Sequence, residues 1–319
     1  MNDTDIHHVH EYSFEEFRNL IQTSIEETIP DFEVYPRIFG GWTNLNLLAS
    51  SRETSMVLKI PAEKRIFDTN PFEYAFTLAS DLNKLNFSPR PIAIGRLPDK
   101  SETPFAIYEY IHGRKYDDIS KLNSCELESL ITLKTKLNLV KLEKMRIFRN
   151  TTEYVDYIIS RHQSDWSQFE PKSELLEKTY NSLIQVKEDI EIIEDSEDWP
   201  IEFMHGDFHL RNIVFPNHEP VLLDFEEAAL GNPLYDYAYL RMESYNPYMY
   251  DQILKRVIPD IQIVEYGKLC KVALYSVIVW TYNRLLLVEH NLVDAILSTT
   301  SRARMMRDYL NSKLKLLMK

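Results

Sequence analysis

The chain has 319 residues, of which 44% are hydrophobic and 12% aromatic, a composition typical of a folded globular protein and not of a disordered one. Its formal net charge of −13 argues against a general affinity for nucleic acid or anionic membranes. The only cysteines, Cys125 and Cys270, are far apart and belong to no Cys/His cluster, so the sequence indicates neither a disulfide framework nor a zinc site. No secretory signal is visible, and the longest apolar stretch, 272–280, is too short to span a bilayer, so we expect a soluble cytoplasmic protein.

The N-terminal third predicts a small sheet with helices. Residues 14–29 carry apolar side chains at helical spacing, and the pattern changes after Pro30. Short runs with strand character are bounded by turn residues and lie at 33–39, 44–50, 55–60, 92–97 and 105–111. Residues 71–87 read as a helix between the third and fourth of these runs. We therefore predict a five-stranded antiparallel sheet with one helix inserted after its third strand.

The remaining two thirds are predicted to be mainly helical. Helical periodicity covers 122–146, 153–163 and 173–193, and helices return from Asp236 to 319. A short hairpin interrupts them, with strands at 213–215 and 221–223. The last helix, 298–319, is basic, and we expect it to be solvated or to pack on an acidic surface of the same chain. The predicted class is α+β with two lobes, 1–110 including a leading helix in 1–30, and a helical lobe at 111–319.

One motif carries the chemistry: the segment His205-Gly206-Asp207-Phe208-His209-Leu210-Arg211-Asn212, followed by Asp224 at the end of an apolar strand. Phosphoryl transfer needs a carboxylate that orients the attacking hydroxyl and oxygen ligands that hold Mg²⁺ against the phosphates. Asp207 could supply the first, and Asn212 with Asp224 the second, since Mg²⁺ takes a few hard oxygen ligands plus phosphate and water. The alternative is a buried turn in which Asp207 caps a helix and Asn212 satisfies the backbone.

The segment 203–240, FMHGDFHLRNIVFPNHEPVLLDFEEAALGNPLYDYAYL, resembles the aminoglycoside phosphotransferase and choline kinase superfamily. The resemblance implies a bilobal protein-kinase-like fold with ATP, or GTP, in the cleft. By position it implies a catalytic base at Asp207, Mg²⁺ ligands at Asn212 and Asp224, and residues that shape or brace the loop at His205 and Asp236. The motifs are not those of a protein kinase, because Asp224-Phe225-Glu226 stands where DFG would be.

The N-terminal lobe should then hold the nucleotide. Lys59 ends the third strand, where a lysine can reach the α and β phosphates, and Glu73 on the following helix is placed to pair with it. The alternative for each is an ordinary surface charge, and Glu63 is also available as the partner of Lys59. Gly40 and Gly41 allow a close approach of backbone to phosphate, although a hairpin turn uses glycine too.

Two further segments of this lobe match the superfamily. The run Gly40-Gly41-Trp42-Thr43-Asn44, followed by MVLKIP, resembles the choline kinase branch and implies that Thr43 and Asn44 belong to the nucleotide site. The run FAIYEYIHG at 105–113 resembles the hinge between lobes, where the backbone of Glu109 and Ile111 would bond the adenine edge. An ordinary edge strand remains the alternative there.

The acceptor is less well specified. Glu226 and Glu227 could face a cationic acceptor, although Glu226 could equally bind a second Mg²⁺ or an arginine. Aromatic faces hold quaternary ammonium groups well. The aromatic candidates are Tyr235, Trp280 and Tyr282, whose helical spacing also fits a core. We predict a kinase of a small hydroxyl compound such as choline or ethanolamine, with an aminoglycoside or sugar kinase and a non-catalytic pseudokinase-like binding protein as the alternatives. No nucleic-acid or membrane partner is expected, and the sequence favours no particular oligomeric state.

Overall fold

The structure is a computed structural model that describes residues 4–39, 41–52, 54–192, 199–244, 263–294 and 299–317. The chain forms two compact units. Met1–Ile111 and Leu287–Arg304 make the first unit, and His112–Leu286 and Met305–Lys319 make the second. The first unit contains the large antiparallel sheet and the second is mainly helical, so the predicted α+β class is confirmed.

The first unit is built on a six-stranded antiparallel sheet with the order β1-β4-β5-β6-β8-β7. Its strands are β1 (Thr4–Asp5), β4 (Phe32–Ile38), β5 (Asn44–Ser51), β6 (Thr54–Pro61), β7 (Pro91–Arg96) and β8 (Pro104–Glu109). The five predicted strands are all present, and the two-residue β1 extends the sheet at the β4 edge. In β5 the side chains of Leu45, Leu47 and Ala49 are fully buried, because alternate residues of a strand face the same side.

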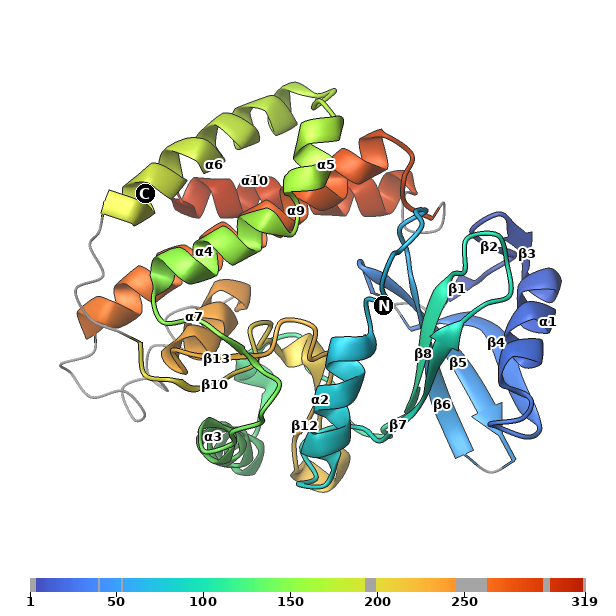
Figure 1. Cartoon of the computed structure of the whole chain (residues 1–319). Coiled ribbons are helices and arrows are strands. Elements are labelled where there is room, and N and C mark those ends of the chain that lie inside the picture. The colour runs from blue at the N-terminus through green and yellow to red at the C-terminus, as the bar shows by residue number, and fades with distance from the viewer. Residues whose placement is uncertain are drawn as a thin grey trace. The chain divides into compact units, whose positions relative to one another are not determined.

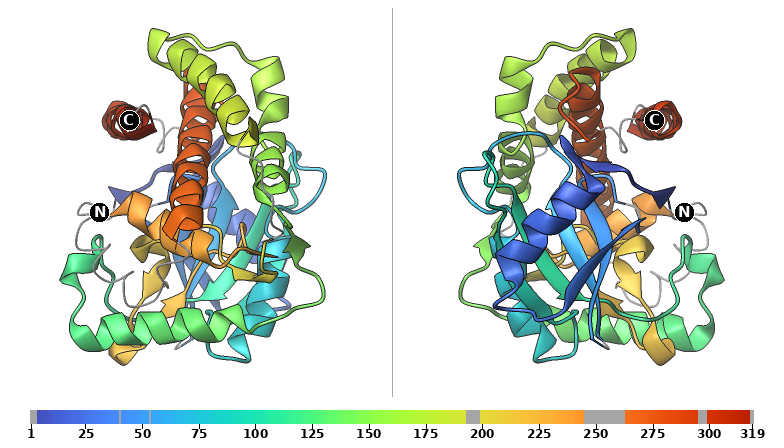
Figure 2. Two further views of the ribbon diagram at one scale, coloured as in Figure 1. Left: turned by 90° about the vertical axis from the view of Figure 1, so that its left-hand side faces the viewer. Right: turned by 90° about the vertical axis from the view of Figure 1, so that its right-hand side faces the viewer.

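Two helices pack against this sheet. Helix α1 (Phe14–Ile25) begins at a capping box between Ser13 and Glu16 and buries its apolar stripe of Phe17, Ile21 and Ile25. It lies across one face of the sheet (Figure 2, right). Helix α2 (Glu73–Asn83) buries Ala75, Leu78, Ala79 and Leu82, and Figure 1 shows the sheet between the two helices. A hairpin of β2 (His8–Val9) and β3 (Tyr12–Ser13) precedes α1.

The segment 287–304 joins the first unit, although the sequence placed it with the helical lobe. Its backbone pairs with residues that follow β6: the Lys64 N–H donates to Leu292 O at 2.8 Å, and the Asp294 N–H donates to Ala62 O at 2.8 Å. The Asp294 carboxylate also accepts the His10 backbone N–H at 2.7 Å. Hydrogen bonds between parts of the chain that are far apart in sequence therefore decide the membership of this segment, and local periodicity carries no sign of them.

The second unit is mainly helical, as predicted. Its helices are α3 (Ser124–Asn138), α4 (Thr151–Ser160), α5 (Gln163–Gln168), α6 (Glu174–Ile192), α7 (Leu234–Glu243), α9 (Ile263–Glu289, up to Leu286) and α10 (Thr300–Leu317, from Met305). Within α9, Tyr266–Glu289 is long and apolar enough for a membrane span by length and composition, but 78% of its most apolar window is buried inside the protein. We interpret α9 as a core helix.

Short strands and single turns carry the candidate site residues of this unit. A small sheet has the order β10-β13-β9, formed by β9 (Arg146–Ile147), β10 (Glu202–Met204) and β13 (Ala229–Gly231). A hairpin joins β11 (Ile213–Val214) to β12 (Val221–Leu222), and the 3₁₀ turns are η1 (Ile119–Lys121), η2 (Leu210–Asn212) and η3 (Pro216–His218). The helix predicted over 122–146 is shorter than expected: α3 ends at Asn138, and Arg146 and Ile147 pair with β13.

Candidate active site

Residues 205–212, the loop after β10 together with η2, hold the predicted base and one predicted metal ligand. The Asn212 Nδ2 donates to the Asp207 Oδ2 at 2.7 Å and to the Asp207 carbonyl at 3.2 Å. The Asp207 side chain is 28% exposed, so it can reach a bound molecule. Because Nδ2 is the donor that faces the carboxylate, the Oδ1 of Asn212 is the atom left to contact a cation.

A buried carboxylate braces this loop. The Asp236 Oδ2 accepts the His205 backbone N–H at 2.8 Å, and its Oδ1 accepts the Gly206 N–H at 3.0 Å. Lys134 of α3 lies 3.1 Å from Asp236, and both side chains are at most 1% exposed. Lys134 also donates to Phe203 O at 3.1 Å, which ties β10 to the same pair. Asp236 thus contacts both the backbone of the loop and the Lys134 ammonium.

Lys134 was missed in the sequence. It lies at helical spacing with Leu130, Leu133 and Leu137, on the buried face of α3. A lysine on an apolar face implies a buried partner, since a buried charge without one costs several kcal/mol, about 3–5 when a partner is removed. The position of Lys134 on an apolar helix face was the feature of the sequence that could have revealed its buried partner.

Gly206 occupies a position that requires glycine. Its φ is +79°, in the left-handed region, and a Cβ there would lie 2.5 Å from Glu227 O. The loop that bears the base therefore packs directly on the backbone that follows Asp224.

His205 links the loop to the strand before Asp224. Its Nε2 lies 3.0 Å from Leu223 O and its Nδ1 3.3 Å from the Asp207 N–H. A carbonyl only accepts and an N–H only donates, so the ring carries its hydrogen on Nε2. The side chain is fully buried, and this burial lowers the pKa of His205 despite the nearby carboxylates of Asp236 and Asp207. His205 thus connects the loop that holds Asp207 to the strand before Asp224.

We expect His205 to make stability depend on pH. Its folded pKa is lowered, so below the unfolded value of about 6.5 the unfolded chain binds a proton that the native state excludes. Its stabilising contribution is therefore complete above about pH 6.5 and is lost as the pH falls toward the lowered folded pKa. His205→Gln keeps a donor for Leu223 O and should flatten this dependence, measured as the free energy of unfolding by denaturant between about pH 7.5 and 5.5. His10→Gln measures separately the contribution of His10, the other histidine whose pKa is lowered by burial. Equal slopes of unfolding free energy against pH in wild type and His205→Gln would contradict the expectation.

Asp224 follows β12, and the residue just before it is hydrogen-bonded to the backbone of Asn212. The Leu223 N–H donates to Asn212 O at 2.8 Å, and Asp224 itself has a φ of +64°, an uncommon conformation for aspartate. Three or more His, Cys, Asp or Glu side chains do not cluster in a metal-binding arrangement anywhere in the described residues. A cation here would have one amide oxygen and one carboxylate from the protein, a donor set that fits Mg²⁺ completed by phosphate and water.

The glycine turn of the first unit is partly described. Gly40 lies outside the described residues. Gly41 has a φ of +101°, and a Cβ there would lie 2.4 Å from Asn44 O, so the turn requires glycine at this position. Thr43 O accepts the Ala62 N–H at 3.0 Å, and the largely buried Asn44 begins β5. The turn is therefore fixed to the end of β6.

Lys59 lies on β6, between Asn46 of β5 and Ala106 of β8. Its Nζ is 5.8 Å from the centroid of the Phe72 ring, a cation–π distance. The pair expected between Lys59 and Glu73 is not formed: Glu73 is exposed at the start of α2 and makes no ion pair with any described residue. Phe72 is the residue that immediately precedes α2.

The predicted hinge residues end the first unit. The Glu109 N–H donates to Arg90 O at 2.9 Å, and the Tyr110 N–H donates to Ser55 O at 3.0 Å. The Glu109 N–H is therefore committed to the protein, which leaves its carbonyl as the group that could accept from a base. Ile111 is the final residue of this part of the unit and is partly buried.

The acidic candidates for acceptor binding differ in their surroundings. Glu227 forms an ion pair with Arg161 and accepts from the Tyr157 hydroxyl at 3.4 Å. Glu226 is partly buried, and its carbonyl accepts from Arg146 Nη1 at 2.7 Å. The negative charge of Glu227 is thus matched within the protein.

The aromatic candidates also divide. Tyr235 is fully buried, with its ring 4.8 Å from that of Tyr154, and Tyr282 is 1% exposed, 5.3 Å from Trp166. Both belong to the core, the alternative that their helical spacing left open, because buried rings have no face for a ligand. Trp280 is partly exposed.

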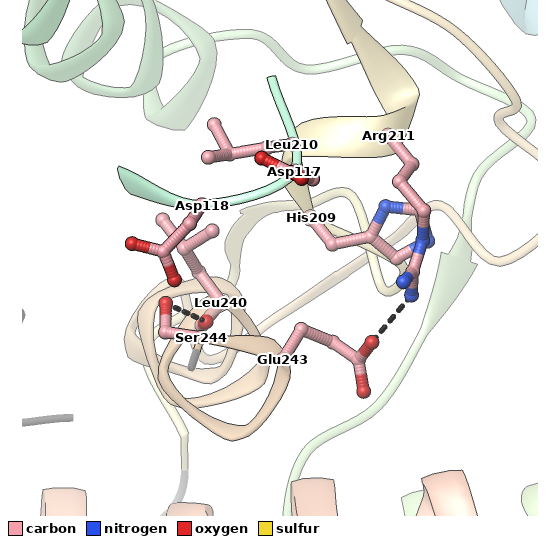
Figure 3. Close-up of a pocket in the computed structure, with 8 residues that line it drawn as sticks. All are labelled: Asp117, Asp118, His209, Leu210, Arg211, Leu240, Glu243 and Ser244. Atoms are coloured by element: carbon pink, nitrogen blue, oxygen red, sulfur yellow. Dashed lines mark hydrogen bonds and ion pairs between the residues drawn. The ribbon is translucent and has the colours of Figure 1, made fainter. Parts of the chain in front are cut away.

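A small pocket lies beside the catalytic loop (Figure 3). It is lined by Asp117, Asp118, His209, Leu210, Arg211, Leu240, Glu243 and Ser244. Glu243, only 5% exposed, pairs with Arg211 of η2 and accepts from Tyr309 of α10, while Lys313 lies 3.3 Å away. Burial would raise the pKa of Glu243, but Lys313 and Arg211 outweigh it and hold that pKa at about 2.

Glu243 gives α10 a contact with the catalytic loop that the sequence did not reveal. The basic helix was expected to be solvated or to pack on an acidic surface of the chain. Lys313 is buried and donates to Met242 O, so part of the basic face is used internally.

A comparison with protein-family models matches residues 35–252 to the phosphotransferase enzyme family. The chain belongs to this family. The predicted resemblance to aminoglycoside phosphotransferases and choline kinases is confirmed, and this phosphotransferase is a small-molecule kinase by family. A search of curated protein sequences finds no match.

Solved structures share the fold of this phosphotransferase at low identity. Choline kinase LicA from Streptococcus pneumoniae is 16% identical with a TM-score of 0.59, covering 93% of this chain and 99% of that one. A thermostable mutant of aminoglycoside phosphotransferase APH(4)-Ia, in complex with AMP-PNP and hygromycin B, is 13% identical with a TM-score of 0.59 over 92% and 97%. Amicoumacin kinase hAmiN, in complex with AMP-PNP, Ca²⁺ and Ami, is 12% identical with a TM-score of 0.59 over 95% and 94%. The predicted kinase-like fold is therefore confirmed.

Proposed function

We propose that this phosphotransferase transfers the γ-phosphate of ATP to a hydroxyl of a small molecule, with Mg²⁺ as the metal. The observation that carries the proposal is the contact of 2.7 Å between Asn212 Nδ2 and Asp207 Oδ2. It orients the carboxylate of the base and turns the amide oxygen of Asn212 outward for the metal. The backbone bond between Leu223 and Asn212 brings the strand of Asp224 to the same place.

Each residue then has a chemical role. Asp207 accepts the proton of the attacking hydroxyl, and Asn212 and Asp224 would hold Mg²⁺, which neutralises charge on the transferred phosphoryl group when bound. Asp236 and His205 keep the loop in place through the contacts described above. The family of the chain and the AMP-PNP in two of the structural neighbours support an adenine nucleotide over a guanine nucleotide.

The first unit would supply the phosphate-binding residues. Lys59 is assigned to the α and β phosphates, and Gly41, Thr43 and Asn44, with Gly40 before them, to the turn that approaches the phosphates. The carbonyl of Glu109 and the N–H of Ile111 are assigned to the adenine edge. Glu73 has no assigned role, since it does not pair with Lys59 in this structure.

For the acceptor we propose an amino-alcohol such as choline or ethanolamine. The partly buried Glu226 and the partly exposed Trp280 are the candidates for an ammonium group, since the rings of Tyr235 and Tyr282 are buried. A polycationic aminoglycoside requires several carboxylates, and the Arg161–Glu227 pair removes one of them. Hygromycin B in the APH(4)-Ia structure makes aminoglycosides the second class to test.

The test is ADP release from the purified protein with Mg·ATP and a panel of amino-alcohols, sugars, amino acids and aminoglycosides. We expect stimulation by one chemical class, with choline and ethanolamine as the first compounds. Stimulation by hygromycin B alone would move the acceptor to the second class. A protein that binds ATP yet releases no ADP with any acceptor would instead be a binding protein.

We expect Asp224→Asn to weaken the dependence on Mg²⁺. The substitution keeps the shape of the side chain and removes the charge that a divalent ion requires. The Mg²⁺ concentration at half-maximal rate should rise on the order of tenfold, in line with the loss of one ligand charge. A titration of Mg²⁺ at fixed ATP measures this value, with Asp81→Asn, a carboxylate of α2 paired with Lys84, as the control. An unchanged Mg²⁺ dependence would exclude Asp224 from the metal site.

A further inference from the structure

His209 lies between the proposed base and η2 and has no role in the mechanism above. Its Nδ1 accepts the Asn212 backbone N–H at 3.2 Å, so the ring caps η2. Its Nε2 lies 3.4 Å from Asp207 Oδ1. The side chain is 13% exposed and stacks on Tyr239, with ring centroids 6.2 Å apart and planes at 29°. The ring is therefore held in one orientation by contacts on two sides.

This orientation fixes the hydrogen of the neutral ring. A backbone N–H can only donate, so Nδ1 must be the unprotonated acceptor. The hydrogen is then on Nε2, the atom that faces Asp207. The other oxygen of Asp207 accepts from Asn212 Nδ2 at 2.7 Å. Each carboxylate oxygen of Asp207 thus faces one N–H group whose own position is fixed.

We propose that His209 is a positioning residue that holds the Asp207 carboxylate in its reactive orientation. This inference rests on the proposed function, in which Asp207 accepts the proton of the acceptor hydroxyl. Asn212 alone holds one oxygen, and the carboxylate could still turn about that contact. A donor at the second oxygen restricts this rotation. Misplacement of a reacting group by about 1 Å can cost on the order of 10²-fold in rate, so such a restriction affects turnover.

The distance of 3.4 Å between His209 Nε2 and Asp207 Oδ1 is that of an ion-pair contact and exceeds the usual N–H···O hydrogen-bond range of about 2.7–3.2 Å. Contacts between catalytic groups are often long in a protein without substrate and shorten in the complex. The alternative is that His209 only caps η2, with no effect on Asp207. The two roles use different nitrogens of the ring, and single substitutions can separate them.

Two isosteric variants make this separation. The Oδ1 of asparagine reaches the position of the histidine Nδ1, and asparagine is among the best capping residues, so His209→Asn keeps the cap and removes the donor to Asp207. The Nε2 of glutamine reaches the position of the histidine Nε2, so His209→Gln keeps the donor and removes the cap.

The experiment compares wild type, His209→Asn, His209→Gln and Asp207→Asn. The probes are Mg·ATP and whichever of choline, ethanolamine or hygromycin B gives the fastest ADP release, with thermal unfolding measured on the same proteins. For His209→Asn we expect kcat to fall about tenfold, both KM values to stay within about twofold and Tm to be unchanged. For His209→Gln we expect kcat within about threefold of wild type and a lower Tm.

Wild-type kcat in His209→Asn, or a loss of kcat in the two variants that follows their loss of Tm, would overturn the inference. The proposed function fails separately, if Asp207→Asn keeps its turnover or if wild type turns over none of the three acceptors. A measurement without any acceptor then decides the geometry: the imidazole ¹⁵N spectrum of the wild-type protein. We expect a protonated Nε2 that shifts in Asp207→Asn and an unprotonated Nδ1. A protonated Nδ1 would overturn the assignment.

Discussion

Asp207→Asn is expected to reduce kcat for phosphoryl transfer by a factor of about 10³, within the range for a positioned general base. The variant removes the group that accepts the proton and leaves a side chain of the same size on the loop. ATP binding should be nearly unchanged, because the proposed phosphate contacts belong to other residues. Steady-state ADP release and calorimetric titration with ATP measure the two quantities.

The isosteric change keeps this test interpretable. An asparagine can turn its amide oxygen toward Asn212 Nδ2, so the contact that spans the loop survives. Thermal unfolding near the wild-type midpoint would show that the loop is intact. Turnover near that of wild type in such a folded variant would remove Asp207 from the role of base.

Asp236→Ala is expected to lower the free energy of unfolding by about 3–5 kcal/mol, the cost of leaving one partner of a buried ion pair alone. The change strips the Lys134 ammonium of its carboxylate and leaves the His205 and Gly206 N–H groups without an acceptor. Denaturant unfolding measures the lost free energy of unfolding. Turnover should fall as well, because His205 and Gly206 directly precede Asp207, the proposed base. Lys178→Ala, at an exposed ion pair with Glu174, is the control and should have no measurable effect.

A second comparison isolates the ion pair itself. Asp236→Asn keeps one amide oxygen for the backbone donors but leaves Lys134 unpaired. Adding Lys134→Met removes that buried charge, so the double variant should be more stable than Asp236→Asn alone. If the stability losses of Asp236→Asn alone and Lys134→Met alone simply add in the double variant, the pair is not coupled. The contact of 3.1 Å then contributes little to stability.

The sequence predicted those parts of the protein in which the contacting residues lie close together along the chain. Asp207 and Asn212 are five residues apart on one short loop, so their contact of 2.7 Å is local. The strands of the first unit were also predictable, because turn residues in the sequence mark where each strand begins and ends. The edge strand β1 was not, because two residues carry too little pattern.

Residues that act over long separations were not predictable. Lys134 and Asp236, or Arg211 and Glu243, pair only once the helices have packed, and no local pattern specifies the partner. The Lys59–Glu73 pair failed for a related reason: the position at the start of α2 was predicted, but the direction of its side chain was not. Burial also decided between the two interpretations of Tyr282, since helical spacing is the same for a core ring and a ligand-binding ring.

The contact of α10 with Glu243 has a consequence for the order in which the protein is made. Translation produces the loop at 205–212 and Glu243 well before Tyr309 and Lys313. Until α10 is synthesised, Glu243 has Arg211 but neither of its partners on that helix, and its burial is unfavourable. The outer side of the catalytic loop should therefore acquire its final contacts late in synthesis, so that a nascent chain lacking α10 would hold the whole motif at 205–224 without its native support.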